Sequence, residues 1–224
     1  MFNLSLSFIS SFLVTMLIVR YAGMFGKFSM DYDLHGVQKN HTHAVPRVGG
    51  IGVVSATCFT CFVGALFGTN PRAETMLLLA VAAPAFCSGL AEDLTKRVSP
   101  RVRLLLAMAG AGLGVYLLDA IVVRVDLPLI DAYLVFAPVA IGLTVLTVAG
   151  LTHAMNIVDG MNGLASVTAI LIFGSIGYVA HEVGDWFVMS VALTMVGAIL
   201  GFVIWNYPMA SVFLGDGGAY FAGF

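Results

Sequence analysis

The sequence predicts an all-α fold, a polytopic bundle of about seven transmembrane helices with the start of an eighth. Composition is the first observation behind this prediction: of 224 residues, 60% are hydrophobic and only 10% are charged. Soluble domains carry more charge than that. The second observation is that the apolar residues form stretches close to the ~20 residues that a helix needs to cross the hydrocarbon core of a bilayer.

The expected spans follow one another with short polar linkers. They cover residues 2–22, 48–68, 75–91, 104–123, 129–152, 162–181 and 186–206. The first has no basic residue before Arg20 and no cleavage pattern after it, so we expect it to remain as an anchor. Another apolar stretch begins near Gly217 and stops at Phe224, too short to cross a membrane. We therefore expect one membrane domain over residues 1–224, truncated at its C-terminus.

Basic residues support this segmentation, because alternate loops share a side of the membrane. One side receives only Arg72 and Arg124. The other collects Arg20, Lys27, Lys39, Arg47, Lys96, Arg97, Arg101 and Arg103. Cytoplasmic loops carry the excess of Lys and Arg, so we expect the larger group inside and the N-terminus outside. The net charge of −2 gives no indication of nucleic-acid binding.

Three polar clusters interrupt the apolar chain, all on the predicted cytoplasmic side. They are Glu92-Asp93, the segment Asn156 to Gly160, and the segment Gly215 to Gly218. Carboxylates are costly near hydrocarbon, so acids kept at the ends of membrane spans are candidates for function.

Two of these clusters are expected to begin helices. Asp159 to Gly163 would open the sixth span, and Asp216-Gly217-Gly218 the eighth. The start of a helix favours anionic phosphate groups, and glycine lets a ligand approach the backbone closely. Asn156 and Asp216 offer oxygen ligands of the kind that Mg²⁺ takes together with substrate phosphates. Each motif alone also fits a helix cap with a tight turn.

The adjacent carboxylates Glu92 and Asp93 repel one another, so they invite a cation or a shared proton and suit a base or a metal site. The basic residues just beyond could neutralise them, hold a lipid phosphate, or simply form a cytoplasmic loop; they are Lys96, Arg97, Arg101 and Arg103.

The loop before the second span carries further candidates for substrate contact. Lys39 and Arg47 can pair with phosphates, and Gly49-Gly50 permits close approach at the start of the span. His41 is expected to form hydrogen bonds within the loop or to contact substrate rather than to bind zinc.

Together, four segments resemble a known family, the polyprenyl-phosphate N-acetylhexosamine-1-phosphate transferases. The segments are His41 to Gly50, Gly89 to Asp93, Asn156 to Ala165 and Phe213 to Gly218. The family includes enzymes that start O-antigen, other lipopolysaccharide-related and teichoic-acid linkage polymers, and the phospho-MurNAc-pentapeptide translocase. The resemblance implies transfer of a sugar-1-phosphate from a UDP-sugar to undecaprenyl phosphate at the cytoplasmic face of the bacterial inner membrane. It also implies Mg²⁺, with Mn²⁺ as a substitute, and release of UMP.

The resemblance assigns roles residue by residue. Asp93 matches the second acid of the family's aspartate pair, which is implicated in activating the lipid phosphate, and Glu92 stands where that pair has its first aspartate. Asn156 and Asp159 match a segment associated with magnesium and nucleotide, and Asp216 matches the aspartate of Phe-x-Gly-Asp. The expected catalytic residues are Asp93, Glu92 and Asp159; substrate-binding residues Lys39, His41, Arg47, Gly49, Gly50 and Asn162; metal ligands Asn156 and Asp216. The family's later His-containing loop and last spans have no counterpart here.

Three alternatives stay open. A transporter would need ionisable residues near the bilayer midplane, whereas most here lie at span ends. A CDP-alcohol phosphotransferase would carry an Arg shortly after Asp159-Gly160, where this chain has Met-Asn-Gly-Leu-Ala. The chain could also be an inactive fragment of the transferase. The identity of the sugar, the pathway and homo-oligomer formation are left open.

Overall fold

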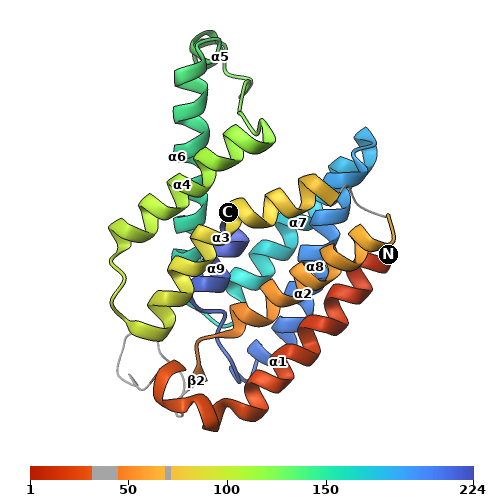
Figure 1. Cartoon of the computed structure of the whole chain (residues 1–224), viewed down its shortest axis with the longest axis vertical. Helices are drawn as coiled ribbons and strands as arrows, with labels where there is room; N and C mark the ends of the chain where they lie inside the picture. The colour runs from red at the N-terminus through yellow and green to blue at the C-terminus, as the bar shows by residue number, and fades with distance from the viewer. Residues whose placement is uncertain (32–44, 69–71) are drawn as a thin grey trace.

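The computed structural model describes residues 1–31, 45–68 and 72–224 and is built almost entirely of helices (Figure 1). Within these residues, seven helices are long and apolar enough to cross a membrane. The predicted all-α, multi-pass architecture is therefore confirmed. The helices are α1 (Phe2–Ser29), α2 (Gly49–Leu66), α3 (Arg72–Thr95), α4 (Pro100–Leu118), α5 (Pro128–Leu134), α6 (Ala137–Val158), α7 (Leu164–Val183), α8 (Trp186–Asn206) and α9 (Gly215–Gly223).

A short antiparallel pair joins the segments on either side of the first loop. Strand β1 (Met30–Asp31) pairs with β2 (Val45–Pro46). Most of that loop, residues 32–44, lies outside the described part of the chain. The pairing brings the chain from the end of α1 back to the start of α2.

The predicted span 129–152 is the one that the structure changes most. It divides into the short helix α5 and the long helix α6, which runs to Val158. Pro128 and Pro138 each lie in the first turn of a helix, where the missing N–H of proline costs nothing. Apolar length therefore indicated that a span lies here, but its bounds were wrong, because the spanning helix runs from Ala137 to Val158 with Pro138 in its first turn.

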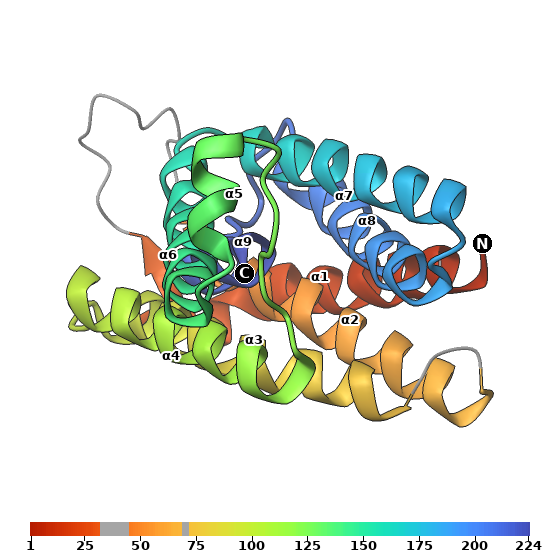
Figure 2. The same cartoon turned by 90° about the horizontal axis from the view of Figure 1, so that it is seen from above.

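Helices α1, α2, α7 and α8 pack side by side, with α1 and α7 both against α8 (Figures 1 and 2). Small residues allow the close approach of α1 to α8. A Cβ added at Gly201 of α8 would lie 2.8 Å from the backbone nitrogen of Phe12 in α1. Such small-residue contacts are typical of helix pairs in membranes.

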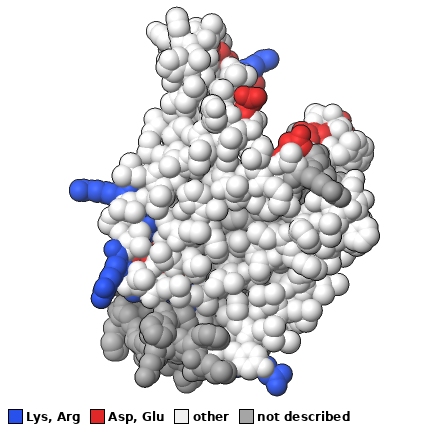
Figure 3. Space-filling model, viewed as in Figure 1, with Lys and Arg blue, Asp and Glu red and all other residues white. Residues whose placement is uncertain are grey.

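The short helix α9 lies at the centre of the molecule, packed against α2, α3 and α6 (Figures 1 and 2). Its Ala219 and Tyr220 are almost completely buried, together with Phe202 of α8 and Val53 of α2. On the face shown in Figure 3, charged side chains lie at the margins and the broad centre is uncharged. That distribution suits a chain whose middle faces hydrocarbon.

Candidate functional site

The first turn of α9 is held by a carboxylate from another helix. Asp93, near the end of α3, accepts hydrogen bonds from the backbone N–H groups of Asp216 (2.9 Å) and Gly217 (2.8 Å). Asp93 is buried, with only 2% of its surface exposed. The first N–H groups of a helix have no partner within the helix and favour negative charge. In this structure the start of α9 binds the Asp93 carboxylate, and binding of a phosphate group there stays a prediction.

Glycines allow α9 to approach its neighbours closely enough for that contact. A Cβ at Gly89, one turn before Asp93 in α3, would lie 2.6 Å from the backbone oxygen of Asp216. Gly49 and Gly50 donate backbone hydrogen bonds to the carbonyls of Phe213 (2.9 Å) and Leu214 (2.8 Å). The close approach expected at Gly49-Gly50 is thus made by the protein's own backbone, and substrate contact there stays a prediction.

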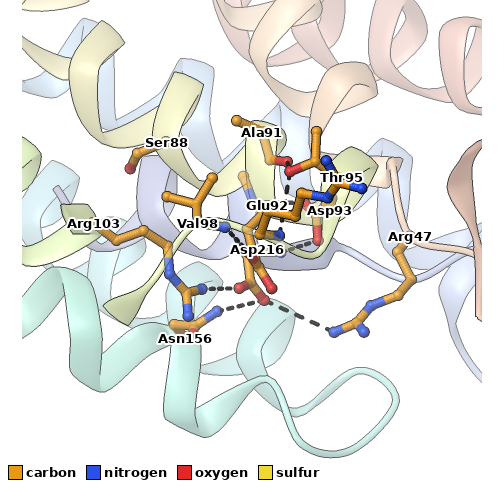
Figure 4. A network of polar contacts seen from close by, with 12 residues as sticks. Arg47, Ser88, Ala91, Glu92, Asp93, Thr95, Val98, Arg103, Asn156 and Asp216 are labelled. Carbon is orange, nitrogen blue, oxygen red and sulfur yellow. Dashed lines mark hydrogen bonds and ion pairs between the residues drawn. The ribbon is translucent and has the colours of Figure 1, made fainter. Parts of the chain in front are cut away.

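The Asp216 side chain is surrounded by nitrogen donors (Figure 4). Its Oδ2 forms an ion pair with Nη1 of Arg103, from the first turn of α4. Its Oδ1 accepts a hydrogen bond from Nδ2 of Asn156 (3.1 Å) and lies 3.8 Å from Nη2 of Arg47. Residues that are far apart in the chain therefore meet at one carboxylate, among them the predicted candidates Asn156, Asp216 and Arg47.

Asn156 and Asp159 do not lie at the start of a helix, which corrects the prediction for the sixth span. They lie at the end of α6, and α7 begins only at Leu164, after Gly163 in the left-handed region (φ 79°). Apolar Ile157 and Val158 continue α6 up to Asp159 itself. Burial and the nearby charges of Asp216 and Asp93 raise the pKa of Asp159 to about 8, while Arg47 acts in the opposite direction. Asp159 therefore lies within electrostatic reach of the same cluster.

A buried asparagine joins the two loops beside the cluster. Asn206, at the end of α8, accepts a hydrogen bond from the backbone N–H of Gly163 (2.7 Å) and donates one to the carbonyl of Val212 (2.8 Å). It ties the loop after Asp159 to the segment that leads into Asp216. No sequence pattern indicated this role, because an Asn at the end of an apolar span fits a solvated loop equally well.

The remaining predicted residues are Glu92, Asn162, Lys39 and His41. Glu92 accepts a hydrogen bond from the backbone N–H of Val98 (2.7 Å), so it stabilises the turn between α3 and α4. Asn162 is exposed in the loop before α7. Lys39 and His41 lie outside the described residues. Their predicted contacts with substrate stay predictions.

Arg103 and Tyr220 are further residues of the site that the motifs did not single out. The Arg103 guanidinium lies over the Tyr220 ring, 5.4 Å from its centroid, and His153 of α6 meets the same ring edge-on at 4.9 Å. Tyr220 is four residues after Asp216, and residues four apart share one face of a helix. That spacing was a signal in the sequence that could have linked Tyr220 to the site.

The chain is similar in sequence to several known proteins. Residues 75–224, more than half of the chain, match the sequence model of the family described as glycosyl transferase family 4. A protein of Bacillus subtilis (strain 168), named "Probable undecaprenyl-phosphate N-acetylglucosaminyl 1-phosphate transferase", is 25% identical over 221 residues, which cover 97% of this chain and 58% of that protein.

Two phospho-N-acetylmuramoyl-pentapeptide-transferases are also similar. The one from Clostridium perfringens (strain 13 / Type A) is 28% identical over 182 residues, 78% of this chain and 56% of the relative. The one from Streptococcus thermophilus (strain CNRZ 1066) is 38% identical over 72 residues, 32% of this chain and 21% of the relative. The chain thus spans just over half the length of the Bacillus and Clostridium relatives.

Proposed function

The chain belongs to glycosyl transferase family 4, and on this premise we propose that it transfers a sugar-1-phosphate from a UDP-sugar to undecaprenyl phosphate. UMP is the leaving product, and an N-acetylhexosamine is the proposed sugar. This reaction would start the synthesis of a cell-envelope polysaccharide. The single observation that supports it best is the meeting of Asp93, Asn156 and Asp216 with two arginines at one end of the bundle.

The site has the charges that such a reaction needs. Both substrates are phosphates, and a phosphate monoester is largely ionised at neutral pH because its second pKa is about 6. Arg47 and Arg103 supply positive charge and can pair with phosphate oxygens in a bidentate way. Alignment and charge stabilisation dominate phosphoryl transfer, so a rigid set of charged groups is what the chemistry requires.

Asp93 is proposed to act on the undecaprenyl phosphate, by orienting or deprotonating it, and Asp159 to help place the nucleotide. In this structure both Asp93 oxygens accept backbone hydrogen bonds. A carboxylate has about four acceptor sites, so these two bonds leave capacity for a further donor. Holding α9 and contacting substrate are therefore compatible roles for Asp93.

The side-chain oxygens of Asp216 and Asn156 are suitable ligands for Mg²⁺, and Mn²⁺ could replace that ion. Among the described residues, no group of three or more His, Cys, Asp or Glu side chains is arranged to hold a metal. Mg²⁺ does not need one, because it is commonly held by one or two protein oxygens together with water and substrate phosphates. The Asp216 carboxylate and the Asn156 amide oxygen would hold the ion, which would neutralise phosphate charge when bound.

We place the site at the cytoplasmic face of the inner membrane, with the N-terminus outside. The support is the distribution of basic residues, since Arg47, Arg97, Arg101 and Arg103 all belong to the end of the bundle that carries Asp216. UDP-sugars are soluble and made in the cytoplasm, so a site at that face can receive them.

The proposal is tested with membranes that contain the chain. They are incubated with undecaprenyl phosphate, Mg²⁺ and a panel of UDP-sugars, and the lipid product is identified by mass spectrometry. Undecaprenyl pyrophosphate linked to one sugar is the expected product. Asp216→Asn should abolish it, whereas Asp126→Asn, an exposed acid paired with Arg124 at the other end of the bundle, should leave it unchanged.

Absence of product from every donor would contradict the proposal for this chain. A version extended to the length of the relatives, assayed in parallel, separates two explanations of such a result. Activity in the longer form alone would show that the 224 residues lack a part that catalysis needs.

A further inference from the structure

We propose that Arg103 is a built-in counter-ion of Asp216 and competes with a divalent cation for that carboxylate. The inference rests on the proposed function, because it concerns the cation assigned to the same carboxylate. It adds a positioning role for Arg103 and Tyr220, neither of which follows from the sequence motifs.

Arg103 places a permanent charge in a largely buried position. Its side chain is only 11% exposed, and a guanidinium cannot lose its charge in a protein. A buried charge requires a partner of opposite sign. Asp216 provides it through Nη1, whereas Nε is buried and has no hydrogen-bond partner in the part of the chain that the structure describes.

Tyr220 explains why Arg103 keeps this position. The guanidinium lies over the ring of Tyr220, which is 1% exposed and cannot turn away. Positive charge over an aromatic face is favourable, and more so away from water. Asp216 and Tyr220 come from successive turns of α9, so one helix face supplies both the ion pair and the ring that receives the guanidinium.

A cation and Arg103 cannot occupy the same place beside Asp216. The two oxygens of Asp216 are engaged, Oδ2 by Arg103 and Oδ1 by the donor nitrogen of Asn156 (Figure 4). A divalent ion would meet the positive guanidinium of Arg103 at Oδ2 and the N–H of Asn156 at Oδ1. An ion that approaches a remaining acceptor site of the carboxylate is repelled by the guanidinium, so its binding is strengthened when that group leaves. The Asn156 amide must also turn its oxygen inward to act as a ligand. The released guanidinium is then free to pair with a phosphate.

Arg47 does not occupy the carboxylate in the same way. Its side chain is 31% exposed, and its Nη2 is 3.8 Å from Asp216 Oδ1. A charge that remains in contact with water and stands farther from the carboxylate competes less with an incoming ion. The competition is therefore assigned to Arg103.

The test measures binding of Mn²⁺ alone by electron paramagnetic resonance, with the purified full chain in detergent and no nucleotide. Arg103→Met keeps the length and apolar stem of the side chain but removes the charge. It should bind Mn²⁺ on the order of tenfold more tightly than the wild type. Arg103→Lys keeps a charge but loses the planar guanidinium, so its affinity should fall between the two. Arg101→Ala, an exposed arginine of the same helix, should match the wild type.

Equal or weaker Mn²⁺ binding by Arg103→Met would overturn the inference, because a residue with a purely structural role has no reason to raise metal affinity when lost. Should Arg103→Met fail to fold, Arg103→Lys decides by the same comparison with the wild type. If neither wild type nor variant binds Mn²⁺, the cation site is refuted and the inference with it. If competition holds but no lipid product forms in the transferase assay, the proposed reaction fails while the counter-ion role of Arg103 stands.

Discussion

The Asp93 side chain accepts a hydrogen bond from the backbone of Asp216, yet the two carboxylates have different surroundings. Asp93 is bound by two backbone N–H groups, whereas Asp216 is bound by the side chains of Arg103, Asn156 and Arg47. Backbone donors are fixed by the helix, but side chains can move to other partners. Asp93 is therefore suited to hold geometry, and Asp216 to exchange its partners during a reaction cycle.

Asp93→Asn should lower activity at least about a hundredfold, the lower range for loss of a group that handles a proton in the reaction. It should also lower the free energy of unfolding by about 1.5–3 kcal/mol, because an amide oxygen replaces a charged acceptor of two hydrogen bonds. Lipid product and thermal unfolding are measured on the same preparation. Asp126→Asn, the same change at an exposed acid at the other end of the bundle, serves as control. Full activity in Asp93→Asn would remove Asp93 from the mechanism.

Asp159 should make the stability of the fold depend on pH. Its pKa of about 8 is above the ordinary value of 3.8, so the folded chain holds a proton that the unfolded chain has lost between these two values. Stability therefore falls as pH rises through this range and is lowest above pH 8. Asp159→Asn cannot ionise and should be more stable than the wild type at pH 8.5, with little difference at pH 4.

The measurement is the unfolding midpoint from pH 4 to 9 in buffer with a chelator, which excludes effects of bound metal. Glu182→Gln, an exposed acid at the end of α7, is the control and should leave the pH profile of the wild type unchanged. A difference between Asp159→Asn and wild type that stays constant over this range would refute the raised pKa.

The sequence singled out candidate polar residues but did not show which groups they contact. Asp93, Asn156 and Asp216 stood out because polar side chains are costly near hydrocarbon, which makes them candidates for function. The pairing of Asp93 with the backbone of Gly217 spans 124 positions, and no local pattern encodes such a distance. Arg103 lay within a basic run whose members differ only in their packing, so its burial could not be foreseen.

For the helices, too, some features follow from local sequence patterns and others do not. All seven spans were predicted from apolar length, and the family expected from the motifs is confirmed. The helix ends depended on smaller signals. Ser99 accepts a hydrogen bond from the backbone N–H of Val102 and starts α4 before the predicted residue 104, and α3 continues to Thr95, past the predicted end at residue 91.

Packing of α9 against α3 leads to a prediction about glycine. In Gly89→Ala the new Cβ would meet the Asp216 backbone oxygen at 2.6 Å, so α9 must shift and the Asp93 hydrogen bonds must lengthen. We expect the free energy of unfolding to fall by about 1–3 kcal/mol, as for other overpacked cores, and activity to fall with it. Denaturant or thermal unfolding and the lipid-product assay measure the two effects.

Gly112→Ala in α4 is the matched control, because nothing lies within 4 Å of the added Cβ. It should be neutral or stabilise the chain by up to about 1 kcal/mol, since alanine favours helix more than glycine does. Equal effects of the two substitutions would mean that α9 is not seated on α3 as described.

The whole molecule has two ends of different character. Asp216 and its partners gather at one end, and the linker with Arg124 and Asp126 and the helix α5 are at the other. The number of spans between these groups fixes them on opposite sides of a membrane. The basic excess is the ground on which we propose that the Asp216 end faces the cytoplasm.

Labelling of single cysteines tests this orientation. In a chain whose native cysteines are replaced, Asp126→Cys should react with a membrane-impermeant maleimide in intact cells, because Asp126 is exposed at the outer end. Arg101→Cys should react only after the membrane is permeabilised. The opposite pattern would invert the topology and place the site where no cytoplasmic nucleotide could reach it.

The central position of α9 has a consequence for biosynthesis. Ribosomes release the chain from its N-terminal end, so α2, α3 and α6 all enter the bilayer before α9 has been made. Until then the place of α9 beside Gly49, Gly50 and Gly89 is unfilled. The Asp93 carboxylate also lacks its backbone donors from Asp216 and Gly217. A chain arrested before residue 215 should therefore be inserted in the membrane but degraded faster than the full chain. Proteases would recognise the helices that lack their packing against α9.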